Sequence, residues 1–319
     1  MILQTTTDLK KYLSLSQNFE FDDFQPYLLK AINSFTRKFV GDLHTQLISV
    51  ATDTNATIKN EAREHLRNAL ANFGYFLYIP YASVQLDSAG ISIVNSDQRK
   101  NAEWWQINDI RRELLRSGHE AMDLLLELLE SNPTIFTAWT ALYNTQNSEL
   151  LVHNSADFNK YYHIFNSRQT YLALQPSIRQ VEDQYMKTML CPELIVVLKT
   201  ASSGNLLEVK SAMQKAIVAF TVAKVANVGL FHLDENGLRV NFETLINGRK
   251  ESASYGKTVD QMNALSIEQI NNGTQYLKIV KDIIETNPTD FMQCAFPLIK
   301  SKIEGSGFTA YDTKGILSL

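Results

Sequence analysis

A metal-binding pair is the first chemistry that the residue types and their spacing suggest. Glu61 and His65 stand four residues apart in a segment of helical periodicity, so their side chains share one face of the predicted helix. A carboxylate and an imidazole placed in this way can bind a divalent metal ion. The sequence offers no third ligand beside them, so the expected role is an exposed ion pair or a solvated face. The remaining histidines are scattered without metal-ligand spacing: His44, His119, His153, His163 and His232.

The two cysteines, Cys191 and Cys294, are the only residues that could supply a thiol nucleophile. Both lie among apolar neighbours without short spacing, so we expect small buried side chains with reduced thiols. The stretch Gly305-Ser306-Gly307 has no helix after it and is expected to be a linker rather than a phosphate-binding loop. Since no motif supports catalysis, the sequence predicts a protein that is not an enzyme and that uses neither a cofactor nor a metal ion.

An aromatic and basic segment lies near residue 100. Trp104 and Trp105 closely follow Arg99 and Lys100, and surfaces of this composition can stack on bases and neutralise phosphates. Because adjacent residues of a helix point about 100° apart, we expect one tryptophan in the core and the other as an anchor for a protein contact. Several carboxylates on the same predicted helix fall on its polar face and are expected to be solvated: Glu120, Asp123, Glu127 and Glu130.

The composition argues against two classes of partner. The 319-residue chain has a formal net charge of -4 and a pI near 5.9, and neither half is basic, so specific nucleic-acid binding is not expected. No apolar run approaches the roughly 18 residues that a membrane span needs, and the N-terminus has no apolar signal core. The sequence therefore predicts a soluble, cytoplasmic protein without a membrane partner.

The chain repeats itself at an offset near 150 residues. The opening segment Ile2–Tyr12 recurs as Leu151–Tyr161, an offset of 149. Caps, turns and core positions recur, and no catalytic constellation does. The sequence therefore predicts a first unit over 1–148, a second, homologous unit over 149–304 and a C-terminal tail over 305–319. Further matches keep offsets between 147 and 155: Gln25-Pro26 with Gln175-Pro176, Ala69–Phe73 with Ala216–Phe220, Arg99-Lys100 with Arg249-Lys250, and Glu130–Phe136 with Glu285–Phe291.

Each unit is expected to be mainly helical. Side-chain oxygens in the segments 5–8 and 154–157 can cap a first helix, and a second helix is expected to begin near Gln25-Pro26 and Gln175-Pro176. Apolar periodicity predicts longer helices over 58–78, 99–129 and 258–285. Alternating residues on either side of 87–90 and 234–237 predict two hairpins. The predicted fold class is mainly α with a β-hairpin per unit (α+β), built as a tandem duplication of two similar helical units.

The opening of each unit resembles a family of viral proteins. The cap and short helix Thr6–Leu13, followed by the acidic pair Asp22-Asp23, resemble the opening of tailed-phage head–tail connector (adaptor) proteins. The stretch Leu151–Tyr162, with Asn166–Arg168 and Leu174–Pro176, is similar to structural proteins of Bacteroides-type phages and prophages. The resemblance implies helical subunits that pack side by side into a ring around the DNA channel between portal and tail. It brings no catalytic residues.

The function that the sequence favours is a non-enzymatic structural or assembly protein, a phage or prophage head–tail connector or adaptor that acts through oligomeric packing. Its partners would be other copies of itself and phage portal or tail proteins. It would be found in the cytoplasm of the bacterial host and in the virion. The alternative is an intracellular two-unit ligand-binding protein with a cleft between the duplicated units. Expected interaction anchors are aromatic, and the tail containing two of them suits strand addition to a partner: Trp104, Trp105, Tyr161, Tyr162, Phe308 and Tyr311.

Overall fold

The computed structural model describes residues 2–47, 55–82, 84–87, 90–93, 102–147, 149–226, 231–234, 237–240 and 259–291 of the chain. These residues belong to two units, Met1–Asn144 and Thr145–Leu319, whereas the sequence predicted a division after residue 148. The two parts are called unit 1 and unit 2 below, and each is described by itself.

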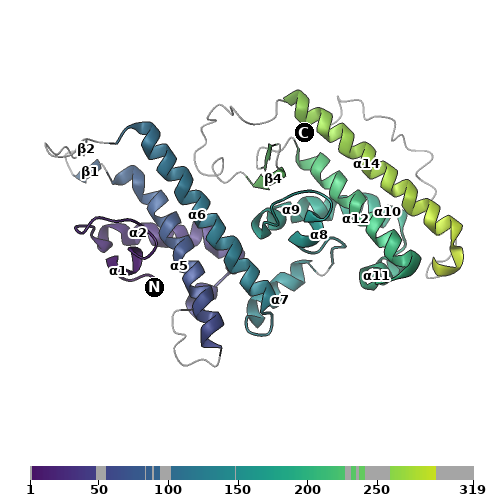
Figure 1. Cartoon of the computed structure of the whole chain (residues 1–319), viewed down its shortest axis with the longest axis horizontal. Coiled ribbons are helices and arrows are strands. Elements are labelled where there is room, and N and C mark those ends of the chain that lie inside the picture. The colour runs from purple at the N-terminus through teal and green to yellow at the C-terminus, as the bar shows by residue number, and fades with distance from the viewer. Residues whose placement is uncertain are drawn as a thin grey trace. The chain divides into compact units, whose positions relative to one another are not determined.

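Unit 1 is built on two long helices, α5 (Ala56–Tyr78) and α6 (Trp104–Ser131), which pack along each other (Figure 1). The shorter α2 (Phe21–Ala31) packs against α5. The stripe predicted for α5 is buried at Leu66 and Phe73, which confirms the helical period of this segment. The other helical elements of unit 1 are α1 (Thr6–Leu9), the π-helical turn η1 (Ile32–Thr36), α3 (Arg37–Val40), α4 (Leu43–Gln46), the 3-10 turn η2 (Ile79–Tyr81) and α7 (Thr137–Asn147), whose last residues belong to unit 2.

Unit 2 repeats this arrangement. Its two long helices are α12 (Gly204–Val225) and α14 (Val259–Thr286), which also pack along each other, and α9 (Arg168–Val181) packs against α12 (Figure 1). Apolar residues surround α12 on nearly every side, and most of them are buried, so this helix is the centre of the unit. The remaining helical elements are α8 (Ser155–Asn159), the π-helical turn η3 (Glu182–Met186), α10 (Lys187–Met189), α11 (Pro192–Thr200) and the 3-10 turn η4 (Pro288–Phe291).

The predicted α+β class is wrong, because the fold is all-α. In the described residues, strands occur only as two isolated four-residue pairs: β1 (Val84–Asp87) with β2 (Gly90–Ile93), and β3 (Phe231–Asp234) with β4 (Gly237–Val240). Two paired strands of this length have no sheet face large enough to form a layer of a core. Helix–helix contacts fill both cores instead, and the two predicted hairpins are present only as these local strand pairs.

The predicted helix starts at Gln25-Pro26 and Gln175-Pro176 are also wrong. Helix α2 begins at Phe21 and α9 at Arg168, so both prolines lie inside their helices. The start of α9 is set upstream, where the Ser167 side chain accepts a hydrogen bond from the Thr170 N–H at 3.2 Å. Each helix then continues into a π-helical turn, η1 or η3. This shared irregularity directs one aromatic residue of each turn towards the central helix, where Phe35 is buried and Tyr185 is partly buried.

The two cores share an aromatic packing motif. The ring of Phe35 in η1 stacks on Phe73 of α5 with centroids 4.3 Å apart, and the ring of Tyr185 in η3 stacks on Phe220 of α12 at 4.0 Å. Both pairs have an interplanar angle of 7°. A glycine of the second long helix faces each phenylalanine. A Cβ on Gly118 would lie 2.5 Å from the Phe73 ring, and a Cβ on Gly273 of α14 would lie 2.7 Å from the Phe220 ring.

Candidate functional site

A side chain of the central helix fastens the opening segment in both units. The Arg67 guanidinium donates its Nε–H to the Ile2 carbonyl at 2.9 Å, and the Gln214 amide donates to the Leu151 carbonyl, also at 2.9 Å. Arg67 and Gln214 are aligned by the sequence repeat, as are Ile2 and Leu151. The same carbonyl is therefore held by the same helix position, although the two side chains differ in charge.

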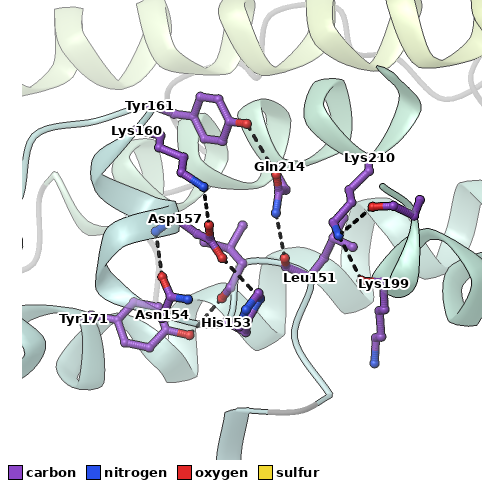
Figure 2. Close-up of polar contacts among 12 residues, drawn as sticks. Leu151, His153, Asn154, Asp157, Lys160, Tyr161, Tyr171, Lys199, Lys210 and Gln214 are labelled. Carbon is purple, nitrogen blue, oxygen red and sulfur yellow. Dashed lines mark hydrogen bonds and ion pairs between the residues drawn. The ribbon is translucent and has the colours of Figure 1, made fainter. Parts of the chain in front are cut away.

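The polar contacts around the opening of unit 2 form a network (Figure 2). The Asn154 side chain caps α8 by accepting from the Asp157 N–H at 2.7 Å. The Asp157 carboxylate then accepts from Lys160 Nζ at 2.7 Å and lies 3.2 Å from His153 Nδ1. Nearby, the Tyr171 hydroxyl donates to the Val152 carbonyl at 2.8 Å.

A histidine paired with a carboxylate is an arrangement that can accept or transfer a proton. In unit 2, however, the same Asp157 carboxylate is shared with Lys160, and the His153 side chain is 52% exposed. The Tyr161 hydroxyl bonds to the Gln214 side chain at 3.3 Å. The remaining bonds of the network end on backbone groups of the opening segment and of the neighbouring turn, where Lys210 Nζ donates to the Lys199 carbonyl at 2.9 Å. The network therefore acts as a clamp on the backbone of the opening segment.

A buried carboxyl completes this clamp. Glu182, at the start of η3, is 2% exposed, and its Oε1 accepts from the Leu151 N–H at 2.7 Å. Burial raises the pKa of Glu182 to about 7, while the backbone N–H groups of Leu151 and Val152 oppose that rise. The aligned residue of unit 1 is Ile32, so only unit 2 has a titratable group at this position.

Tyrosines of unit 1 form an aromatic cluster that opens onto the surface. We call Tyr27, Tyr75, Tyr78 and Tyr81 the tyrosine face. The buried ring of Phe24 lies at its base, 6.0 Å from the Tyr78 ring. The Tyr27 ring lies 5.4 Å from Tyr78 and 5.2 Å from Tyr81, distances typical of favourable ring pairs. The cluster combines residues of α2, α5 and η2, so the packing of α2 against α5 assembles it.

The outer edge of the tyrosine face is polar and accessible. Tyr81 is 41% exposed, and Lys30 Nζ lies 5.2 Å from the centre of the Tyr27 ring. No hydrogen bond within the described part of the chain engages the four tyrosine hydroxyls. Burial raises the pKa of Tyr75 and Tyr78, and the Asp23 carboxylate adds to the rise at Tyr78. The hydroxyls of Tyr75 and Tyr78 are therefore neutral near pH 7, and a phenolic hydroxyl can donate one hydrogen bond to a partner.

The described residues of unit 2 contain no counterpart of the tyrosine face. The residues aligned with Tyr27, Tyr75 and Tyr78 are Ser177, Val222 and Val225, and both valines are buried in the core of unit 2.

The predicted aromatic anchors occupy different environments. Trp105 is 53% exposed at the start of α6, and Trp104 is the first residue of that helix. Tyr161 lies partly inside unit 2, where its hydroxyl lies 3.3 Å from both Ser211 Oγ and Gln214 Oε1, and Tyr162 packs against the core. Phe308 and Tyr311 lie outside the described residues.

The predicted ion pair is present. His65 Nε2 lies 3.9 Å from Glu61 Oε1, and the described residues contain no group of three or more His, Cys, Asp or Glu side chains that could hold a metal ion. Glu120 contacts Arg116 at 3.4 Å on the exposed side of α6, as its predicted solvated position requires.

The expectation of a reduced thiol is wrong for Cys191. This residue is disulfide-bonded and not a free thiol, while its Sγ accepts from the Leu194 N–H at the start of α11. Cys294 and the segment 305–307 lie outside the described residues.

Sequence reasoning missed the tyrosine face and Glu182. The tyrosine face does have a signal in the sequence. Tyr75, Tyr78 and Tyr81 recur every three residues and therefore follow one side of a helical segment. Glu182 gave no such signal, since a carboxylate on an amphipathic helix is ordinarily solvated.

Part of the chain matches the model of a known protein family. The model of a family of unknown function, DUF6712, matches residues 33–149. The match runs from η1 to just beyond α7, so the similarity covers most of unit 1 and includes three members of the tyrosine face. No curated protein and no solved structure matches the chain. Within the described residues, no helix has the length and apolar character needed to cross a membrane.

Proposed function

We propose that this protein is a non-enzymatic structural or assembly protein of a phage or prophage, of the head–tail connector or adaptor kind. It acts by packing against other copies of itself and against portal or tail proteins. The resemblance of both opening segments to connector proteins supports this role. The structural observation that carries the proposal is the tyrosine face, which belongs to unit 1 alone.

Tyrosine suits a protein contact for physical reasons. Its ring buries a large apolar area, its side chain loses little conformational entropy on ordering, and its hydroxyl can bond across the interface. In the tyrosine face, the buried Phe24 ring supports Tyr78 from below, so the outer rings are held in place before a partner binds. Preorganised aromatic side chains of this kind are those that contribute most to binding in protein interfaces.

The tyrosine face is the surface that we assign to the contact with a neighbouring copy in a ring. A ring requires a heterologous contact, in which the tyrosine face of one copy meets a different surface of the next. The positive charge of Lys30 beside Tyr27 favours an acidic or carbonyl-rich surface on the neighbour. The clamps on the two opening segments hold each unit rigid within such an assembly.

The proposal is tested by the solution mass of the full chain, measured by light scattering across a concentration series. A discrete species of more than two copies is expected. The double variant Tyr27→Ser/Tyr81→Ser should shift that species towards smaller masses, whereas the matched control Val196→Ser should not. Val196 is 65% exposed on α11 of unit 2, so the control removes exposed apolar area outside the tyrosine face.

Two results would contradict the proposal. A chain that never exceeds two copies at any concentration would remove self-packing through a heterologous contact and would favour the two-unit ligand-binding protein. A multimer that both variants leave unchanged would exclude the tyrosine face as its contact surface.

A further inference from the structure

The outward faces of α6 and α14 differ at aligned positions. Both helices pack on the central helix of their unit with one side and expose the other. On α14 the exposed row consists of Ile267, Asn271, Gln275 and Ile279, which repeat every four residues and contain no charge. The row at the aligned positions of α6, also exposed, is Arg112, Arg116, Glu120 and Leu124.

The charged row of α6 is satisfied within its own helix. Arg116 pairs with Glu120 at 3.4 Å and with Glu113 at 2.7 Å, and Arg112 pairs with Asp109 at 3.6 Å. This face is therefore suited to solvent. On α14, by contrast, Ile267 is 49% exposed and Ile279 is 44% exposed. Two exposed β-branched apolar side chains in one uncharged row are unusual for a helix that faces only water.

The exposed face of α14 is also symmetric in its chemistry about Gly273. Ile267 and Ile279 lie six residues to either side of this glycine, and Asn271 and Gln275 lie two residues to either side. When two such helices cross antiparallel at Gly273, each isoleucine faces the opposite isoleucine and each amide faces the opposite amide. An amide side chain both donates and accepts, so the central pair can bond across the two-fold axis.

The charges beside this row obey the same symmetry. Glu268 and Lys278 lie five residues to either side of Gly273, and both are exposed. Within the described part of the chain, neither has an ion-pair partner. In the antiparallel pairing, Glu268 of one copy lies at the same level along the helix as Lys278 of the other, where these long side chains can pair, and the two-fold axis creates this contact twice. The face is therefore complementary to itself in apolar, amide and charged positions alike.

We propose that the exposed face of α14 is a docking surface for a second copy of this chain, which binds through the same face in an antiparallel, two-fold arrangement. An isologous contact closes after two copies and cannot by itself build a ring. The inference therefore goes beyond the proposed function and stands or falls separately from it. Because one helix face makes a small interface, the dimer forms reversibly and depends on protein concentration.

The test is sedimentation velocity of the full chain from low to high micromolar concentration. The wild type is expected to exchange between one and two copies, or to add a two-fold step to any larger assembly. Ile279→Lys should raise the dimer dissociation constant about tenfold or more. Leu124→Lys, at the aligned and equally exposed position of α6, is the matched control and should leave the constant unchanged.

Charge reversal gives a second test that does not depend on apolar contacts. Glu268→Lys and Lys278→Glu should each weaken the dimer, because each places like charges opposite one another twice. The double variant should restore the wild-type constant, and added salt should reduce all these differences. The inference is overturned if the chain forms no two-copy species, if Ile279→Lys and Leu124→Lys behave alike, or if the double reversal is as weak as the single ones. A multimer of more than two copies that ignores all these variants would overturn the inference and leave the proposed function standing.

Discussion

The aromatic stack of unit 1, Phe35 on Phe73, has centroids 4.3 Å apart, and the stack of unit 2, Tyr185 on Phe220, has them 4.0 Å apart. The opening carbonyl of each unit accepts a bond of 2.9 Å from the central helix. The exposed residues of the two units, by contrast, differ. Unit 1 has the tyrosine face and a charged outer row on α6, whereas the part of unit 2 that the structure describes has neither and exposes the uncharged row of α14. The interior contacts therefore define the unit, and each of the two copies has its own surface.

The largest effects are expected from the shared stack. Phe73→Ala and Phe220→Ala each remove a buried ring and leave a cavity, so each should lower the free energy of unfolding by about 3–5 kcal/mol. Hydrogen exchange resolved by residue should show the loss of protection in the unit that carries the substitution. If one variant lowers the free energy of unfolding no more than a substitution at an exposed position does, the two stacks do not have the same structural role.

The next largest effect is a pH dependence of the stability of unit 2, which arises from Glu182. Unit 1 has Ile32 at the aligned position and should not show it. The folded state raises the pKa of Glu182 from 4.5 to about 7, so the native state holds a proton that the unfolded state has released. Stability of unit 2 should therefore fall as pH rises through this window and then level off, by roughly 2–3 kcal/mol. Denaturant unfolding at several pH values measures the fall.

The variant Glu182→Gln should abolish most of that pH dependence. The glutamine oxygen can still accept from the Leu151 N–H, and the side chain has no proton to lose. Glu193→Gln, an exposed carboxyl on α11, is the control and should leave the wild-type profile intact. An unchanged profile in Glu182→Gln would show that some other group causes the fall.

Glycine substitutions test how closely the stacks are matched. In Gly118→Ala and Gly273→Ala the new Cβ would lie 2.5 and 2.7 Å from the facing phenylalanine ring. We expect a loss of about 1–3 kcal/mol from overpacking, although alanine favours a helix by about 1 kcal/mol. Thermal unfolding measures the stability of each variant against the wild type. A gain in stability would mean that the ring moves aside and that glycine is not required there.

Helix positions were predictable from the sequence, and the surfaces were not. The predicted helices over 58–78 and 258–285 lie within two residues of α5 and α14, because long apolar periodicity determines a helix locally. The caps at Thr5 and Asn154 were predictable because a cap also depends only on nearby residues, and both side chains accept a hydrogen bond from an N–H in the first turn of their helix. The tyrosine face was not, since residues near 27 and near 78 meet only after α2 packs on α5.

The errors in the fold prediction have a common cause. Local alternation around residues 87–90 predicts paired strands, but a pair of four-residue strands cannot set the class of a fold with four long helices. Local proline chemistry likewise predicts a start for α2 near Pro26, whereas the residues before it extend the helix upstream. Glu182 shows the same limit, because its burial depends on where the opening segment lies and not on its own helix.

The smallest expected effect separates the two opening clamps. Gln214→Met removes the bond to the Leu151 carbonyl, which is buried with its residue at 1% exposure, and should cost about 1–3 kcal/mol because the carbonyl loses its partner away from water. Arg67→Met removes the equivalent bond to Ile2 from a side chain that is 18% exposed, so water can replace part of it and about 1 kcal/mol is expected. Hydrogen exchange of the first turn of α1 and α8 reports each clamp separately. Equal losses would show that the clamps remain equivalent despite the change from arginine to glutamine, whereas no loss in either unit would show that the opening segments are held by their buried apolar side chains alone.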